Sequence, residues 1–108
     1  MRAFHGTAVK NVKSIEKQGL LSKYEGVYLT DSAESAARWI GFRLRAMGEN
    51  TMAVIEVEVN EEELEEGVDH SPMMVQIFGV GRSLVSPESI PAAKIVNIHY
   101  FQIVQPKK

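Results

Sequence analysis

Residues 53–59 limit most strongly what this chain can fold into, because apolar residues and glutamates alternate there. The apolar positions are Ala53, Ile55, Val57 and Val59, and the glutamates are Glu56 and Glu58. Successive side chains of a strand point to opposite faces, so this period of two predicts a strand with one buried face and one face in water. A sheet is therefore required to cover the apolar face.

Two amphipathic helices are predicted before this strand. The first carries Val12 and Ile15 on one face and ends at Gly19, a natural left-handed C-cap. The second begins at Asp31, where Asp-Ser-Ala-Glu has the form of a capping box, and ends at Gly48. Its apolar stripe repeats every three or four residues, with the arginines mostly off the stripe (Ala33, Ala37, Ile40, Leu44 and Met47 on it; Arg38, Arg43 and Arg45 off it).

Short β-rich runs complete the pattern. Strands are predicted at Ala3 and Phe4, ending at His5, and at residues 26–30, 83–85 and 94–104. A short acidic helix is predicted to start at Asn60, residues 73–78 fit a strand or a helix, and residues 79–81 form a turn. The order β-α-β-α-β, followed mostly by strands, predicts an α+β fold rather than a doubly wound one.

Composition limits the class of protein. A chain of 108 residues predicts one domain, residues 1–108, with one modest core, and its 44% hydrophobic and 24% charged residues are ordinary for a globular protein. The net charge of −2 argues against a surface built mainly to bind nucleic acid through its phosphates. No cysteine is present, which excludes disulfides and thiolate metal sites and suits a reducing compartment.

Membrane, metal and phosphate-loop sites are not expected. No apolar run approaches the roughly 20 residues of a membrane helix, and no signal-peptide pattern follows Met1. We therefore expect a cytoplasmic protein with no membrane partner. His5, Asp69 and His70 include no helix-spaced pair of metal ligands, and the glycines at 79 and 81 are too few for a phosphate-binding loop.

The tripeptide His5-Gly6-Thr7, at the end of the first predicted strand, is the first candidate for a binding site. His5 would donate a hydrogen bond there, Gly6 would let a ligand approach the bare backbone, and Thr7 would add a hydroxyl. The alternative is a strand-end histidine followed by a turn glycine, and the tripeptide alone favours that structural interpretation.

Tyr28 and Trp39 are the second candidate, eleven residues apart on a predicted strand and the helix that follows it. Two aromatic rings facing one cleft can sandwich a planar heterocycle, at about 1–3 kcal/mol per stacked ring. The alternative is packing in the core, to which aromatic residues contribute strongly. For Trp39 alone, core packing is the favoured interpretation, since it lies close to the apolar stripe.

Three segments in order resemble the ADP-ribosyltransferase superfamily. They are HGT at 5–7, NVKSIEKQGL at 11–20 and GVYLTDSAESAARW at 26–39. The resemblance is to the branch with a His-Tyr-Glu triad, which includes diphtheria-toxin-like and poly-ADP-ribose polymerase enzymes, and whose fold the NAD-dependent tRNA 2′-phosphotransferase shares. It implies a small α+β fold of mostly antiparallel, split β-sheets with two main helices in the N-terminal half.

The resemblance also implies a chemistry. NAD would be the substrate, nicotinamide would be released, and ADP-ribose would pass to a macromolecular acceptor, a protein or a nucleic acid. His5 would hydrogen-bond the NAD ribose, the Gly6 backbone would hold the nicotinamide amide with Thr7 nearby, and Tyr28 and Trp39 would sandwich the ring. His5 and Tyr28 would be the first two members of the triad.

Two positions depart from the family pattern. Ala36 stands where polymerase-like members carry a serine that binds the amide, and the position of the triad glutamate falls near Arg82 or Ser83, with Glu88 out of register. Arg82 is then the candidate third catalytic residue, acting on a phosphate. The departures leave alternatives open: an inactive module that binds NAD, an NAD-derived nucleotide or a protein; an NAD-dependent RNA 2′-phosphotransferase; or a purely structural role.

Overall fold

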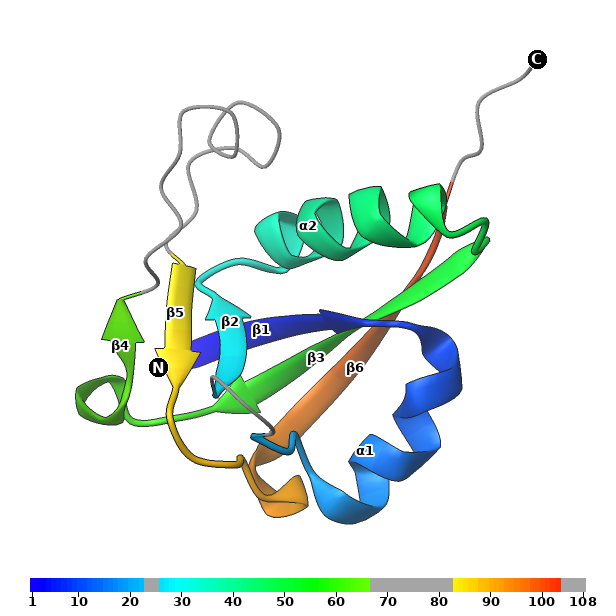
Figure 1. The fold of residues 1–108 in the computed structure, drawn as a ribbon. Coiled ribbons are helices and arrows are strands. Elements are labelled where there is room, and N and C mark those ends of the chain that lie inside the picture. The colour runs from blue at the N-terminus through cyan, green and yellow to red at the C-terminus, as the bar shows by residue number, and fades with distance from the viewer. Residues whose placement is uncertain (23–25, 67–82, 104–108) are drawn as a thin grey trace.

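An antiparallel sheet carrying two helices from the N-terminal half makes an α+β fold, as expected (Figure 1). The computed structural model describes residues 1–22, 26–66 and 83–103. In chain order its elements are β1 (Arg2–Thr7), η1 (Val9–Asn11), α1 (Val12–Gln18), β2 (Val27–Thr30), α2 (Ala33–Ala46), β3 (Thr51–Glu58), η2 (Glu61–Glu63), β4 (Glu65–Glu66), β5 (Ser83–Ser86), η3 (Ala92–Lys94) and β6 (Ile95–Gln102), where η denotes a short 3-10 helix.

The sheet is divided between β1 and β2. Its strand order is β4-β5-β2-β1-β3-β6. β1 pairs with β3 along its whole length, from Arg2 opposite Glu58 to Thr7 opposite Ala53, but it meets β2 at a single pair, Phe4 opposite Thr30. Figure 1 shows β2 and β5 running steeply across the direction of β1 and β3. Two half-sheets of three strands each are thus joined at one point, in agreement with the expected mostly antiparallel, split arrangement.

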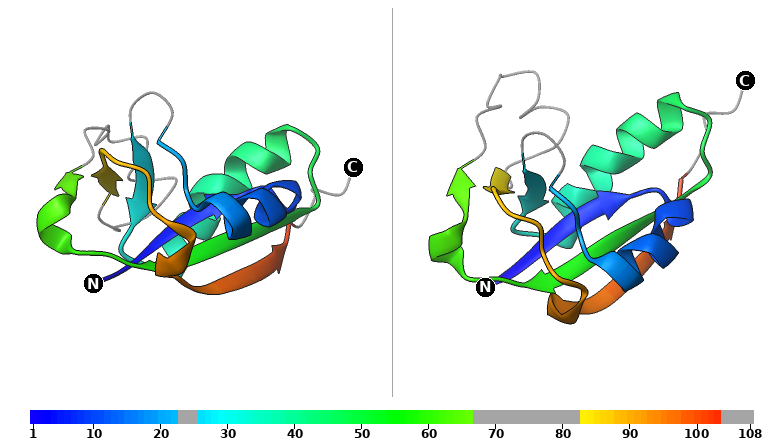
Figure 2. Two further views of the ribbon diagram at one scale, coloured as in Figure 1. Left: turned by 90° about the horizontal axis from the view of Figure 1, so that it is seen from below. Right: turned by 60° about the horizontal axis from the view of Figure 1, so that its bottom comes forward.

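Both faces of the β1-β3-β6 half are covered by helices, α2 on one side and α1 on the other (Figure 2). One apolar cluster includes Ala3, Leu20, Val27, Leu29, Ile55, Val57, Leu84 and Ile90, with Ile15 of α1 packed against it. The other joins Ala8, Leu44, Met52 and Ile103, with Ala37 and Ile40 of α2 packed against it. The core therefore lies in two layers, with β3 between them.

The prediction that β3 has one face in water holds only for its second half. Met52 to Ile55 are all buried, because α2 covers the face that the alternation assigned to water. Glu56 is half-buried and Glu58 exposed. Alternation in the sequence therefore located the strand correctly, but it did not reveal the helix packed over the strand's first half.

Helix α2 begins one residue later than predicted. Ser32, not Asp31, is the N-cap: its backbone is extended and its Oγ accepts a hydrogen bond from the Ser35 N–H at 3.1 Å. The Thr30 hydroxyl donates to the Ser32 carbonyl at 2.6 Å and helps fix this start. The predicted capping box at Asp31 is wrong. So is the inclusion of Met47 in the buried stripe, since Met47 follows the helix and is 62% exposed.

The remaining predicted elements in the described residues are confirmed with shifted ends. Gly19 ends α1 with φ of 78°, a conformation that favours glycine, and its N–H donates to the Ile15 carbonyl at 2.7 Å. β1 continues to Thr7 rather than stopping at His5. The acidic segment forms η2, capped by Asn60. The predictions for residues 73–78 and 79–81 lie outside the described residues. No helix in the described part of the chain is long and apolar enough to cross a membrane.

Candidate functional site

The HGT tripeptide lies where β1 and β2 separate. Continued antiparallel pairing beyond Phe4 and Thr30 would place His5 opposite Leu29 and Gly6 opposite Tyr28, but neither pair forms. Residues 5–7 therefore pair with β3 on one edge, while their other edge faces the split between the two half-sheets. The pairing of the two half-sheets therefore stops at the residues that the resemblance assigns to NAD.

His5 bridges this split. Its Nδ1 lies 2.8 Å from the backbone carbonyl oxygen of Tyr28. A carbonyl oxygen only accepts hydrogen bonds, so Nδ1 must carry the proton and donate it. In the neutral ring that leaves Nε2 as a hydrogen-bond acceptor. The sequence predicted that His5 donates toward the ligand, whereas this geometry uses the Nδ1 proton for the Tyr28 carbonyl and leaves Nε2 as an acceptor.

Burial of the His5 ring lowers its pKa below the ordinary value of 6.5, and the hydrogen bond to Tyr28 offsets that shift only in part. The imidazole is therefore neutral at pH 7. The residue is half-buried, and within the described residues no hydrogen bond to Nε2 is found. His5 can thus accept a hydrogen bond from a ligand hydroxyl, such as that of a ribose.

We expect ¹⁵N NMR to show His5 as the Nδ1–H tautomer, titrating below pH 6.5. Because the folded pKa is lowered, the unfolded chain binds the proton more readily. The His5 contribution to stability is therefore complete above pH 6.5 and is lost as the pH falls toward the folded pKa. A His5→Asn variant should lack this part of the pH dependence. An Nε2–H tautomer, or a pKa above 6.5, would contradict the assignment.

Gly6 lies within β1 and not in a turn, so the alternative of a turn glycine is wrong. A Cβ at this position would lie 2.5 Å from Cγ2 of Ile40 and 2.8 Å from the carbonyl oxygen of Ala36. Helix α2 therefore packs directly on the Gly6 backbone. This contact explains the glycine without a ligand, and binding of an amide by the Gly6 backbone stays a prediction.

Thr7 is buried, and its hydroxyl oxygen accepts a hydrogen bond from Nδ2 of Asn11 at 3.1 Å. The bond ties the end of β1 to the 3-10 turn that leads into α1. Thr7 therefore helps hold the strand end in place, and its direct contact with a ligand stays a prediction.

The two aromatic residues are not buried in the core. Tyr28 is 48% exposed and Trp39 is 39% exposed, so the core-packing interpretation of Trp39 is wrong. Residues directly opposite on paired strands point to the same face. Since Thr30 is opposite Phe4, Tyr28 lies on the face that α2 covers.

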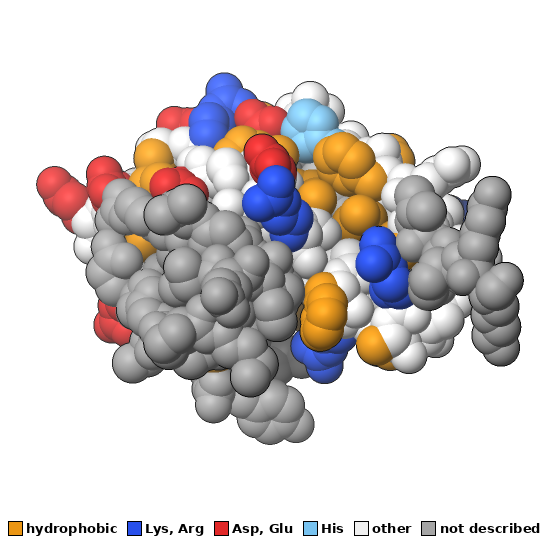
Figure 3. Space-filling model, turned by 90° about the horizontal axis from the view of Figure 1, so that it is seen from above, with side chains coloured by type: hydrophobic (Ala, Val, Ile, Leu, Met, Phe, Trp, Pro, Cys, Tyr) orange, Lys and Arg blue, Asp and Glu red, His pale blue; other side chains and the backbone are white. Residues whose placement is uncertain are grey.

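Trp39 lies on the same side of the sheet as Tyr28, on the flank of α2 nearer to β2. Ile40 contacts Gly6, and Trp39 precedes it by about 100° around the helix. The opposite flank of α2 carries Arg38, Gly41 and Arg45. It lines a groove whose other side is formed by Met52 of β3 and Phe101 of β6. Figure 3 shows the apolar and basic side chains on the α2 face of the molecule. The fold thus brings Tyr28 and Trp39 into one layer beside the split.

No acidic residue occurs in β5, the strand beside β2. Arg82, the candidate third residue, lies outside the described residues. Glu88 follows β5 in an exposed turn, where its carbonyl accepts a hydrogen bond from the Ser86 hydroxyl at 2.7 Å. Glu88 therefore lies beyond β5, the strand that pairs with β2.

Glu65 is a carboxylate that sequence analysis did not single out. It pairs with Val85, which pairs with Tyr28, so the three residues form a row on one face of the sheet. Two strand spacings of about 4.8 Å separate Glu65 from Tyr28, roughly 10 Å in all. The sequence carried no signal for this placement, because it depends on the register of β4 and β5.

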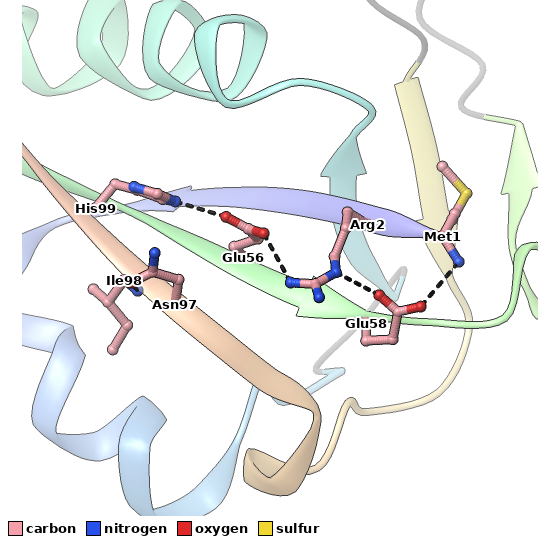
Figure 4. A network of polar contacts seen from close by, with 7 residues as sticks. All are labelled: Met1, Arg2, Glu56, Glu58, Asn97, Ile98 and His99. Carbon is pink, nitrogen blue, oxygen red and sulfur yellow. Dashed lines mark hydrogen bonds and ion pairs between the residues drawn. The ribbon is translucent and has the colours of Figure 1, made fainter.

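A polar network lies on the half-sheet formed by β1, β3 and β6 (Figure 4). Glu56 accepts a hydrogen bond from Arg2 at 3.0 Å and is bonded to Nε2 of His99 at 2.7 Å, while Arg2 also pairs with Glu58 at 2.6 Å. The hydrogen bond from His99, with a smaller contribution from Arg2, lowers the pKa of Glu56 against the opposing effect of burial. The network joins β1, β3 and β6. In the described parts of the chain, no three potential ligands are grouped to hold a metal ion.

Comparison of the chain with models of known protein families, and with curated proteins, found no match.

Proposed function

We propose that this chain binds NAD at the split between its half-sheets and transfers ADP-ribose to a macromolecular acceptor, releasing nicotinamide. The observation that carries the proposal is the bridge from His5 to the Tyr28 carbonyl. It orients a neutral imidazole at the place where the sheet opens, with Nε2 available to accept a hydrogen bond from a ribose hydroxyl.

Each residue has a distinct role in this proposal. Tyr28 and Trp39 stack on the nicotinamide ring, which suits their half-exposed positions in one layer. The backbone of Gly6, on the edge of β1 that faces the split, holds the amide, with Thr7 nearby. As nicotinamide leaves, the ribose gains positive charge, and a neutral His5 orients the sugar without repelling that charge.

Two residues are proposed for the charged parts of the reaction. Arg82 would bind the pyrophosphate, since a guanidinium forms strong paired hydrogen bonds with phosphate oxygens. Glu65, in the same row as Tyr28, is the carboxylate that would stabilise the cationic ribose. We place the protein in the cytoplasm, a proposal that the absence of cysteine supports.

The reaction is tested with NAD labelled in its adenylate part, incubated with the chain and a cell lysate. We expect free nicotinamide by chromatography and label retained on macromolecules after denaturing wash. Digestion with protease or nuclease then identifies the acceptor class. If neither nicotinamide release nor label transfer is seen at millimolar NAD, the transferase proposal is refuted.

A second candidate is a catalytically inactive module that binds NAD, an NAD-derived nucleotide or a protein partner. The absence of an acidic residue from β5 favours it, as does Ala36 in place of the serine that the family uses for the amide. NAD binding without nicotinamide release would identify this candidate. If the chain is such an inactive module, a Glu65→Gln variant should bind NAD as the original chain does.

A further inference from the structure

The two edges of the sheet, as the described residues form it, are built differently. Edge strands expose unpaired backbone groups, and proteins protect them by making them short, charged, proline-containing or bulged. β4, at one edge, has two residues, both glutamates. β6, at the other, has eight residues and contains no lysine, arginine, aspartate, glutamate or proline. One edge is protected, and the other is long and uncharged.

Hydrogen bonds show which backbone groups of β6 point outward. The Ile98 N–H donates to the Asn97 side-chain oxygen at 2.9 Å (Figure 4 shows both residues). The Ile103 N–H instead points inward and donates to the Asn50 carbonyl at 2.8 Å. Inward and outward groups alternate in an antiparallel pair, so Ile98, Tyr100 and Gln102 direct their N–H and C=O groups away from β3.

The outward-facing stretch, residues 98–102, is regular, and its apolar residues are Ile98, Tyr100 and Phe101. The irregularity in the β3–β6 pairing lies between Glu56 and Val57, at the far end of β6, so it leaves Ile98 to Gln102 undistorted. Tyr100 is 60% exposed and Phe101 is 39% exposed, on opposite faces of the strand. His99 is already bonded to Glu56.

We propose that β6 pairs antiparallel with β6 of a second copy of this chain, joining two sheets across a two-fold axis. The occupant of this edge must supply an extended backbone with outward groups and no opposing charge. β6 supplies these groups at Tyr100 and Gln102, whereas the Ile98 N–H must first leave the Asn97 side chain. Two-fold pairing is self-complementary, and the uncharged strand brings no acidic or basic side chains into like-charge contact. The inference does not depend on NAD binding.

Light scattering across a concentration series tests the pairing. The mass should rise from the 12.0 kDa of one chain toward twice that value. Tyr100→Thr and Tyr100→Pro both remove the exposed ring, but only proline removes the outward N–H and places its own ring on the strand edge. Tyr100→Thr should still associate, whereas Tyr100→Pro should stay monomeric with an unchanged circular dichroism spectrum.

Three results would overturn the proposal. They are a constant mass of 12.0 kDa at all concentrations, equal association of the two variants, and fast amide exchange that does not depend on concentration. The exchange experiment uses the original chain, so it stays decisive if Tyr100→Pro fails to fold. Pairing should slow exchange of the Tyr100 and Gln102 amides as the concentration rises.

Discussion

Nicotinamide release from NAD is expected to fall by about 100-fold when His5 is replaced by alanine, the loss typical of removing one preoriented hydrogen-bonding group at a reacting centre. The substitution removes the Nε2 acceptor and also breaks the bridge from Nδ1 to the Tyr28 carbonyl across the split. Release rates at saturating NAD, followed by chromatography, measure the effect.

A His5→Asn variant separates the two functions of this ring. The asparagine amide can still donate to the Tyr28 carbonyl from nearly the position of Nδ1, but it offers nothing at the position of Nε2. We expect His5→Asn to unfold near the temperature of the original chain and yet to release nicotinamide as slowly as His5→Ala. Activity retained by His5→Asn would show that Nε2 has no part in the reaction.

Replacing Gly6 with alanine is expected to lower the free energy of unfolding by about 1–3 kcal/mol, the cost of overfilling a packed site. The new Cβ would lie 2.5 Å from Cγ2 of Ile40 and 2.8 Å from the Ala36 carbonyl, so helix α2 must shift. For a chain of this size each kcal/mol lowers the midpoint of thermal unfolding by about 4–8 °C. Circular dichroism melting measures the change.

Gly41→Ala is the matched control, because Gly41 is a buried glycine of α2, the helix that packs on Gly6. Its Cβ would approach only the flexible end of Met52, at 3.3 Å, and alanine favours a helix over glycine by about 1 kcal/mol. We expect little change or a small gain in stability. Equal effects of Gly6→Ala and Gly41→Ala would contradict the close packing of α2 on β1.

Gly6→Ala should also weaken NAD binding, for a structural reason. Trp39 is carried by α2, which rests on Gly6 through Ala36 and Ile40. A displaced helix moves Trp39 relative to Tyr28, which belongs to the sheet. The glycine thus links the packing of the fold to the geometry of the aromatic pair.

The elements that the sequence predicted correctly are those with a local signature. The period-two alternation located β3, the three-to-four spacing located α2, and Gly19 marked the end of α1. The start of α2 was misplaced because Asp31 and Ser32 are both good caps. Only the backbone conformation of Ser32, with its bond to Ser35, decides between them.

Features that arise from contacts distant in sequence were not predictable. The bond from His5 to Tyr28 and the row from Glu65 to Tyr28 depend on strand register, and the packing of Ile40 on Gly6 depends on how α2 lies over the sheet. Trp39 was assigned to the core because it lies beside the apolar stripe. It is partly exposed because that stripe is narrow and is centred on Ala36, Ile40 and Leu44.

Titration of the chain with NAD, followed by the fluorescence of Trp39, tests the central claim most directly, since Trp39 is the single tryptophan. Stacking of nicotinamide on its ring should change the emission in a saturable way. The change should be lost in Tyr28→Ala, which removes the second ring and leaves Trp39 in place. Emission that stays constant up to millimolar NAD would contradict the proposed binding site.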